Sequence, residues 1–115
     1  MDFHMTMNLV YQFGDPALGV ARTYITSNIR KGVLFSNTAG YSNLEVDKLF
    51  DEAAVATSDV KRQELYSAVQ KLLVEEMPVC WMFEAEYPNF IDKRLKNVLT
   101  TGIGVHETFG SVYFG

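Results

Sequence analysis

The sequence of 115 residues contains one cysteine, two histidines and three prolines, and it has no long run of apolar residues. The single cysteine, Cys80, has no internal disulfide partner, and its place in an apolar run predicts a buried thiol that packs as a small hydrophobic side chain. The longest strongly apolar run, Pro78 to Phe83, is far shorter than the roughly 20 residues that cross a bilayer. The N-terminus has neither a basic region nor a continuous apolar region, so it does not resemble a secretory signal.

Basic residues are also few. Ten Lys and Arg residues stand against 14 Asp and Glu residues, which gives a formal net charge of -4. No run of Lys or Arg interrupts this balance, so we expect neither a nucleic-acid partner nor a polybasic membrane contact. The hydrophobic fraction of 48% is ordinary for a folded protein and argues against disorder. The length favours one domain, which makes residues 1–115 a single unit.

Residues that bind metals or catalyse reactions are scarce as well. His4 and His106 are far apart in the sequence and no cysteine cluster accompanies them, so we expect no metal or other cofactor. No phosphate loop, nucleophile elbow or zinc-protease motif is present. Glu84 and Glu86 are two residues apart, which is the spacing that places side chains on one face of a strand. They are either the paired carboxylates of a hydrolase or, in the interpretation that we favour, solvated charges at the end of a strand. We assign no catalytic residue and expect that the chain is not an enzyme.

The first third of the chain combines an alternating segment with a long polar stretch. Residues Phe3 to Leu9 alternate between apolar and polar side chains, which predicts a strand with one apolar face. A turn at residues 14–16 ends this strand. The stretch from there to Tyr41 is polar with interleaved apolar residues, which predicts a long ordered loop with a helical turn near Ala17 to Asn28.

Two helices and a buried strand are expected to follow. Ser42 and Glu45 form a capping box at the start of the first helix. The second helix is expected to begin at Asp59, with Asp59 as its N-cap, and to end before Pro78. Residues 79–83 are apolar on both faces, which predicts a strand buried on both sides.

A short strand is expected at Leu95 to Leu99, followed by an irregular tail. The order strand, long loop, helix, helix, strand is of the α/β class. A strand buried on both sides needs neighbours at both edges, and this chain offers few. The sequence therefore looks like a piece of something larger.

Neutral hydrogen-bonding and aromatic side chains gather in the long loop. Such groups suit a cleft for a polar organic ligand, or they satisfy the backbone of their own loop. Asp15 either holds a cationic ligand group or fixes the turn with Pro16, and Trp81 is expected to pack against the sheet. The candidate ligand-binding residues are Gln12, Asp15, Tyr24, Asn28, Asn37 and Tyr41.

Several short segments resemble one known family in their sequence and their order. They are GDP at residues 14–16, GYSN with EVDKL at residues 40–49, KR followed by LY and Q at residues 61–70, EEMP with the apolar run at residues 75–83, and KNV at residues 96–98. This series resembles the C-terminal part of the extracytoplasmic solute-binding proteins of family 5. Those proteins are the dipeptide, oligopeptide and nickel receptors of ABC importers.

The resemblance implies a role in capturing a solute for import. The fold it implies is a two-lobed α/β periplasmic-binding-protein fold of type II, of which residues 1–115 would be the C-terminal portion of the second lobe. The tail from about residue 88 would return towards the first lobe, which would lie upstream with the signal sequence and most of the cleft. The implied partners are a small solute and an ABC permease in the membrane, and the implied location is the periplasm.

One position departs from the pattern of the peptide-binding members. These carry an Asp where Gln12 stands here, and that Asp pairs with the α-amino group of the ligand. A neutral amide forms hydrogen bonds but no ion pair, so a peptide-like solute and another small polar solute both remain open.

The alternative interpretation is a small interaction module that derives from the same family and has no transport activity of its own. A second copy of the chain would then complete the unfinished sheet by edge pairing. Self-association of the isolated chain is the prediction that separates the two interpretations.

Overall fold

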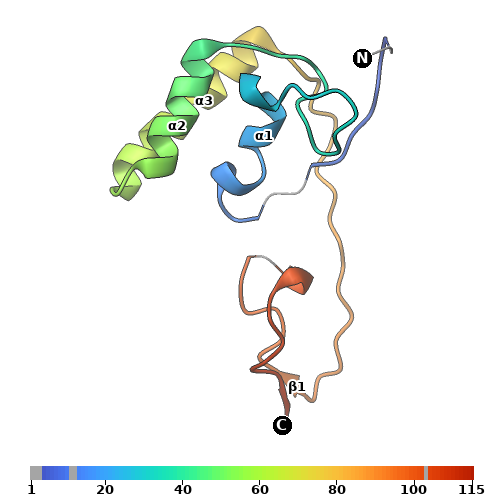
Figure 1. Cartoon of the computed structure of the whole chain (residues 1–115). Helices are drawn as coiled ribbons and strands as arrows, with labels where there is room; N and C mark the ends of the chain where they lie inside the picture. Colours follow the sequence, from blue (N-terminus) through green and yellow to red (C-terminus); the bar gives the residue numbers. More distant parts are fainter. Residues whose placement is uncertain (1–3, 11–12, 103) are drawn as a thin grey trace. The chain divides into compact units, whose positions relative to one another are not determined.

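The computed structural model describes residues 4–10, 13–102 and 104–115. The chain forms two compact units, Met1–Cys80 and Trp81–Gly115. The first unit holds the α-helices and the second holds the short strands (Figure 1). No helix of the described residues is both long enough and apolar enough to cross a membrane.

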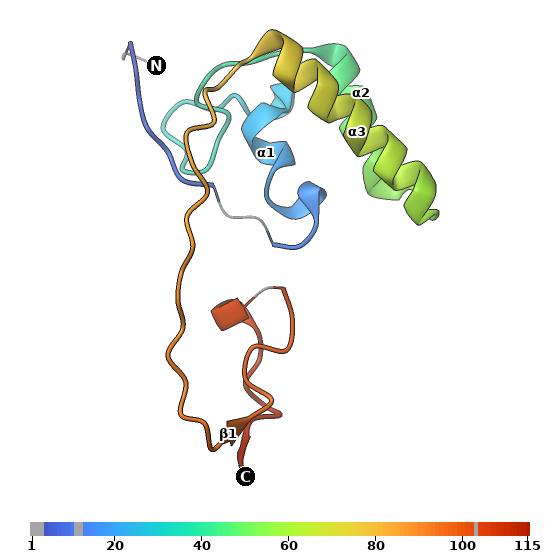
Figure 2. The same cartoon turned by 180° about the vertical axis from the view of Figure 1, so that it is seen from behind.

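A pair of helices forms the centre of the first unit. Helix α2 (Leu44–Val55) and helix α3 (Asp59–Glu76) are joined by residues 56–58 and lie side by side in both views (Figures 1 and 2). Apolar residues at helical spacing explain the pairing, because they give each helix one face to bury. The buried side chains of this core are Val46 and Phe50 from α2 and Val69 and Leu73 from α3.

The helix starts differ by one residue from the sequence prediction. Asn43, and not Ser42, caps α2: its side-chain oxygen accepts hydrogen bonds from the backbone N–H groups of Glu45 at 2.9 Å and Val46 at 3.3 Å. The Ser42 hydroxyl is paired instead with the Thr26 hydroxyl at 3.0 Å. Likewise Ser58, and not Asp59, caps α3. Ser, Asn and Asp are all good N-cap residues. Local sequence alone therefore does not decide which of two adjacent residues of these types caps a helix.

The end of α3 confirms the prediction that the helix stops before Pro78. Its last residue is Glu76, and Met77 then adopts the left-handed conformation with φ of 44°. The backbone N–H of Met77 still donates to the carbonyl of Leu73 at 2.9 Å. The residue before a proline avoids the right-handed helical region, which accounts for the stop at this point.

Short helical turns occupy the first part of the long loop, as the sequence predicted. They are the 3-10 turn η1 (Pro16–Leu18), the single-turn helix α1 (Ala21–Tyr24) and the 3-10 turn η2 (Thr26–Asn28). Ala21 and Tyr24 are buried and join the core of α2 and α3. The loop is therefore packed onto the helix pair.

Two of the predicted strands are wrong in the described structure. Residues 4–10 form no strand and are exposed, while Phe3 lies outside the described residues. Val79 to Phe83 also form no strand, and Cys80, Trp81 and Phe83 are exposed rather than buried. Alternating or apolar residues become a strand only where a neighbouring strand accepts and donates the backbone hydrogen bonds. Within the described residues no such neighbour pairs with either segment.

The second unit contains a two-stranded antiparallel sheet. Strand β1 (Leu95–Lys96) pairs with β2 (Tyr113–Phe114), so that Leu95 lies opposite Phe114, and the 3-10 turn η3 (Gly104–His106) lies between them in the sequence. The strand predicted at Leu95 to Leu99 ends early because Asn97 and Leu99 adopt left-handed φ values of 57° and 56°. The tail, predicted to be irregular, supplies the second strand.

Candidate functional site

Asn37 lies at the centre of the candidate ligand-binding loop. Its side chain is fully buried, with 0% exposure. The amide nitrogen donates to the carbonyl oxygens of Ile25 at 3.2 Å and Tyr41 at 2.7 Å, and the amide oxygen accepts from the backbone N–H of Tyr41 at 3.2 Å. A buried amide needs partners of this kind. Asn37 thus joins the middle of the loop, at Ile25, to its end at Tyr41.

Asn28 also holds this loop through hydrogen bonds to its backbone. Its amide nitrogen donates to the carbonyl oxygens of Arg22 at 2.7 Å and Phe35 at 3.1 Å. Its own backbone carbonyl accepts from the N–H of Asn37 at 2.9 Å. The structure therefore brings Asn28 and Asn37 together, and the hydrogen bonds described for both amides are to backbone groups of the loop.

The rings of Tyr24 and Tyr41, both part of this loop, meet edge to face. The ring centroids are 6.5 Å apart with an angle of 88° between the planes, and Tyr24 is buried. The Tyr41 hydroxyl donates to the Glu76 carboxylate at 2.6 Å. Burial disfavours the phenolate and raises the pKa of Tyr41 to about 12, and the hydrogen bond to Glu76 and its negative charge contribute to this rise.

Asp15 belongs to a separate cluster on the side of α3. Its carboxylate caps η1 by accepting from the backbone N–H of Ala17 at 2.9 Å, and it forms an ion pair with Arg62. The Tyr66 hydroxyl lies 3.5 Å from the same carboxylate. The hydrogen bond from Ala17, with smaller contributions from Arg62, holds the pKa of Asp15 below its ordinary value. Gln12, the sixth candidate residue, lies outside the described residues.

Sequence reasoning missed the charged and polar partners of these residues. Arg62, Glu76 and Asn43 each stand in one of the short segments that resemble the family, but nothing in the sequence paired them with the loop. Arg62 lies 47 residues from Asp15, and Glu76 lies 35 residues from Tyr41. The one sequence feature that could have indicated the contacts of Tyr41 and Asn43 with Glu76 is the presence of both the GYSN and the EEMP segments in the chain.

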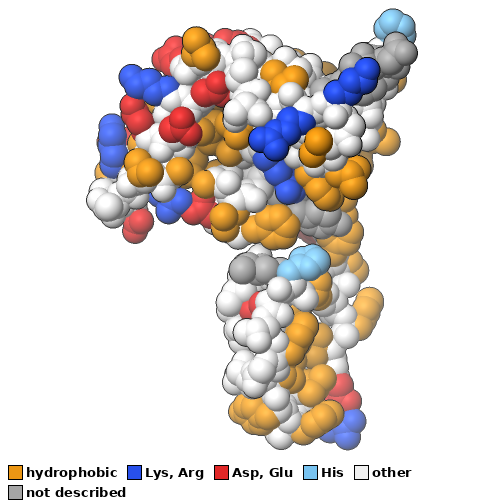
Figure 3. Space-filling model, viewed as in Figure 1, with side chains coloured by type: hydrophobic (Ala, Val, Ile, Leu, Met, Phe, Trp, Pro, Cys, Tyr) orange, Lys and Arg blue, Asp and Glu red, His pale blue; other side chains and the backbone are white. Residues whose placement is uncertain are grey.

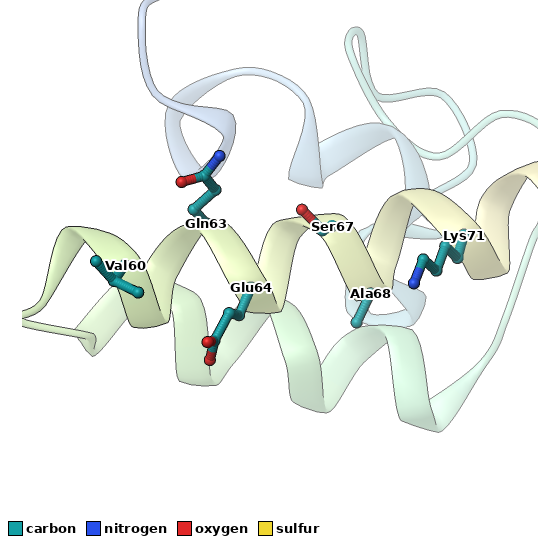
Figure 4. A pocket seen from close by; sticks show the side chains of 6 residues that line it. All are labelled: Val60, Gln63, Glu64, Ser67, Ala68 and Lys71. Atoms are coloured by element: carbon teal, nitrogen blue, oxygen red, sulfur yellow. The ribbon is translucent and has the colours of Figure 1, made fainter.

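Two shallow hollows lie elsewhere on the first unit. One, of about 360 Å³, lies along α3 and is lined by side chains of that helix (Figure 4). Its lining residues are Val60, Gln63, Glu64, Ser67, Ala68 and Lys71. The other, of about 250 Å³, lies between the first described residues and the loop, and it is lined by Thr6, Met7, Asn8, Val33, Leu34, Phe35 and Thr38. Neither hollow is lined by a candidate residue.

Exposed hydrophobic side chains are numerous on both units (Figure 3). In the second unit they include Trp81, exposed by 54%, and Phe90, exposed by 97%. Glu84 and Glu86 of the same stretch are exposed. Within the described residues, no three His, Cys, Asp or Glu side chains are grouped closely enough to hold a metal ion.

Two curated proteins are similar to this chain. The probable D,D-dipeptide-binding periplasmic protein DdpA of Escherichia coli K12 is 30% identical over 84 residues, which are 73% of this chain and 16% of that protein. The oligopeptide-binding protein OppA of Bacillus subtilis 168 is 30% identical over 79 residues, which are 69% of this chain and 14% of that protein. No family model matches the chain, and no solved structure matches it.

These similarities support a relationship to the solute-binding proteins of family 5. Both relatives are named as binding proteins and not as enzymes. The chain spans only about one seventh to one sixth of the length of these relatives. Its small mixed helix and strand structure is compatible with a piece of a solute-binding protein.

Proposed function

We propose that this chain is part of the substrate-binding component of an ABC importer. It would contribute to the non-covalent capture of a peptide-like or other small polar solute in the periplasm, before an ABC permease moves the solute across the membrane. In this mechanism the solute shifts a conformational equilibrium and no covalent bond changes. The observation that carries the proposal is the similarity over about 70% of the chain to two proteins named for binding peptides.

The ordered loop supports the proposal with suitable chemistry. Asn28, Asn37 and Tyr41 are held together by hydrogen bonds in one segment that packs on a helical core. Ligand sites are commonly built from loops that a rigid scaffold positions in this way. We keep Gln12, Asp15, Tyr24, Asn28, Asn37 and Tyr41 as the proposed ligand-binding residues, with Asn37 and Tyr24 contributing through the shape of the loop because both are buried.

The first experiment determines the size and the cellular location of the polypeptide that contains this chain. Cells of the source organism are fractionated and probed with an antibody raised against this chain. A band several times larger than 13 kDa in the periplasmic fraction supports the transport proposal. A 13 kDa band in the cytosol overturns it in favour of an independent module.

The second experiment tests binding itself. The polypeptide that the antibody detects is purified and heated with dipeptides, oligopeptides, an opine or a sugar, and its melting temperature is recorded. A solute that raises the melting temperature of the wild type, and raises it less in the Gln12→Ala variant, supports the proposed site. Equal shifts in both proteins contradict the assignment of Gln12, and the absence of any shift contradicts the binding function.

The alternative proposal, a self-associating module, has one structural observation in its favour. Met82, Phe83 and Phe90 are exposed by 70%, 74% and 97% in a stretch without secondary structure. Exposed apolar side chains in a segment outside any sheet can pack against a second copy of the chain. Light scattering of the isolated chain decides: a dimer favours the module, and a cooperatively folded monomer contradicts it.

A further inference from the structure

The carboxylate of Glu76 contacts two residues of the segment that leads into α2. Its Oε2 atom accepts from the Tyr41 hydroxyl at 2.6 Å, and its Oε1 atom accepts from the Asn43 amide nitrogen at 2.7 Å. Both carboxylate oxygens are therefore used, by partners 35 and 33 residues away in the sequence. Charge-assisted hydrogen bonds of this length are stronger than bonds between neutral groups.

Helix stability alone does not explain an acidic residue at this position. Glu76 is the last residue of α3, and the C-terminus of a helix carries partial negative charge that disfavours a carboxylate. The neighbouring Glu75 is exposed to solvent on the same turn. The two hydrogen bonds from Tyr41 and Asn43 offset the unfavourable position of Glu76.

Each partner of Glu76 is itself committed to a second structural task. Asn43 uses its amide oxygen to cap α2, while its amide nitrogen donates to Glu76. The side chain of Asn37 forms hydrogen bonds with both the backbone N–H and the backbone carbonyl of Tyr41, and the Tyr41 ring meets Tyr24 edge to face. The Glu76 carboxylate thus ties the end of α3 to the start of α2 and to the end of the loop.

We propose that Glu76 is a positioning residue that fixes Tyr41 and Asn43, and through them the end of the candidate ligand-binding loop. The effect of Glu76 on solute binding rests on the proposed function above. The structural part, that Glu76 holds Tyr41 in place, does not. With its hydroxyl proton directed at Glu76, Tyr41 offers a solute its ring and the remaining oxygen lone pairs. A solute group that meets this oxygen must therefore be a hydrogen-bond donor.

The test uses the ionisation of Tyr41 as its reporter. The Tyr41 ring is followed by carbon NMR between neutral and alkaline pH, and the Tyr41→Phe variant assigns its signal among the six tyrosines. In the wild type, burial together with Glu76 holds the pKa of Tyr41 at about 12. In Glu76→Gln the negative charge is lost and the shape is kept, so the Tyr41 titration is expected to move to lower pH without returning to 10.0.

Glu75→Gln is the matched control, because it removes the same charge from the adjacent exposed residue. If Tyr41 titrates at lower pH in Glu76→Gln and unchanged in Glu75→Gln, the contact is supported. If Tyr41 titrates alike in the wild type and Glu76→Gln, the contact is overturned. Circular dichroism at each pH confirms that all variants stay folded over the range compared.

A binding measurement then separates this inference from the proposed function. In the polypeptide that carries the chain, a solute that binds the wild type is measured against both variants. A weaker affinity in Glu76→Gln alone supports positioning, and equal affinity with an altered Tyr41 titration overturns it. If no solute binds the wild type, the proposed function fails and with it the binding role of Glu76, while the Tyr41 titration still decides whether Glu76 fixes the loop.

Discussion

Asp15 and Arg62 form an ion pair that joins the start of the long loop to α3, although 47 residues separate them in the sequence. The Asp15 carboxylate also caps η1 through the Ala17 N–H. Arg62 is only 31% exposed at its side chain, and its Nε atom is buried without a hydrogen-bond partner in the described structure. The pair therefore holds a partly desolvated guanidinium against a turn that depends on the same carboxylate.

Replacing Asp15 by Ala removes both the cap and the ion pair. We expect the free energy of unfolding to fall by about 1–2 kcal/mol at neutral pH, as for the loss of a helix cap. The pKa of Asp15 lies below its ordinary value of 3.8 in the folded chain. Its stabilising contribution is therefore present above that value and is lost as the pH falls through the lower folded pKa. Urea unfolding at several pH values measures the loss.

The expected pH dependence gives this prediction its own control. The difference between the wild type and Asp15→Ala must shrink below pH 4, because Asp15 becomes protonated in the wild type as well. Asp51→Ala, on the exposed face of α2, should cost no stability at either pH. A difference that stays constant from neutral to acidic pH would contradict the ion-pair contribution.

The helices and the packed loop could be predicted from the sequence because their causes are local. The spacing of Val46, Phe50, Val69 and Leu73 specifies the buried faces of α2 and α3, and Pro78 explains the end of α3. Asn43, the observed cap of α2, also donates a hydrogen bond from its amide nitrogen to Glu76 at the end of α3. Local sequence does not contain that information.

The strands and the side-chain contacts of the candidate site could not be predicted in the same way. A strand at Val79 to Phe83 requires a partner strand, and within the described part of the chain none pairs with it. The left-handed conformation of Leu99 has no signal in composition, because leucine rarely adopts it, whereas asparagine, as at Asn97, adopts it more often. The partners of Asp15 and Tyr41 come from α3, and only the folded helix pair brings them close.

Asn37 is predicted to be the polar residue whose loss costs the loop most. Asn37→Ala leaves the partly buried carbonyls of Ile25 and Tyr41 without the donor that they have in the wild type. We expect a loss of about 1–3 kcal/mol, the usual cost of unsatisfied buried polar groups. Thermal unfolding followed by circular dichroism measures it. The exposed Asn8→Ala serves as control and should change stability by less than about 0.5 kcal/mol.

Leu73 and Val74 are adjacent on α3 and offer a direct test of which face is buried. Leu73 is 6% exposed and belongs to the core, whereas Val74 is 54% exposed. Leu73→Ala should lower the free energy of unfolding by about 2–5 kcal/mol through the lost contacts and the cavity. Val74→Ala should change it by about 0.5 kcal/mol or less. Urea unfolding that shows equal losses would place the core on another face of α3.

Met77 is expected to be a residue whose replacement by glycine stabilises the chain. It ends α3 in the left-handed conformation with φ of 44°, and its side chain is 59% exposed. An L-residue pays about 1–2 kcal/mol for this conformation, and glycine does not. Little apolar contact is lost, but glycine also has more conformational freedom in the unfolded chain, which reduces the gain. We therefore expect Met77→Gly to raise the free energy of unfolding by a net amount of at most about 1 kcal/mol.

Replacing the neighbouring Glu75 by glycine is expected to change stability in the opposite direction. The comparison therefore isolates the effect of backbone conformation at Met77. Glu75 lies inside α3, where a glycine costs about 1 kcal/mol relative to alanine. Glu75→Gly should therefore lower the unfolding temperature while Met77→Gly raises it, in the same buffer and on the same helix turn. If both variants lower it, Met77 does not hold the left-handed conformation in solution, and α3 must end in a different way because Pro78 still prevents its regular continuation.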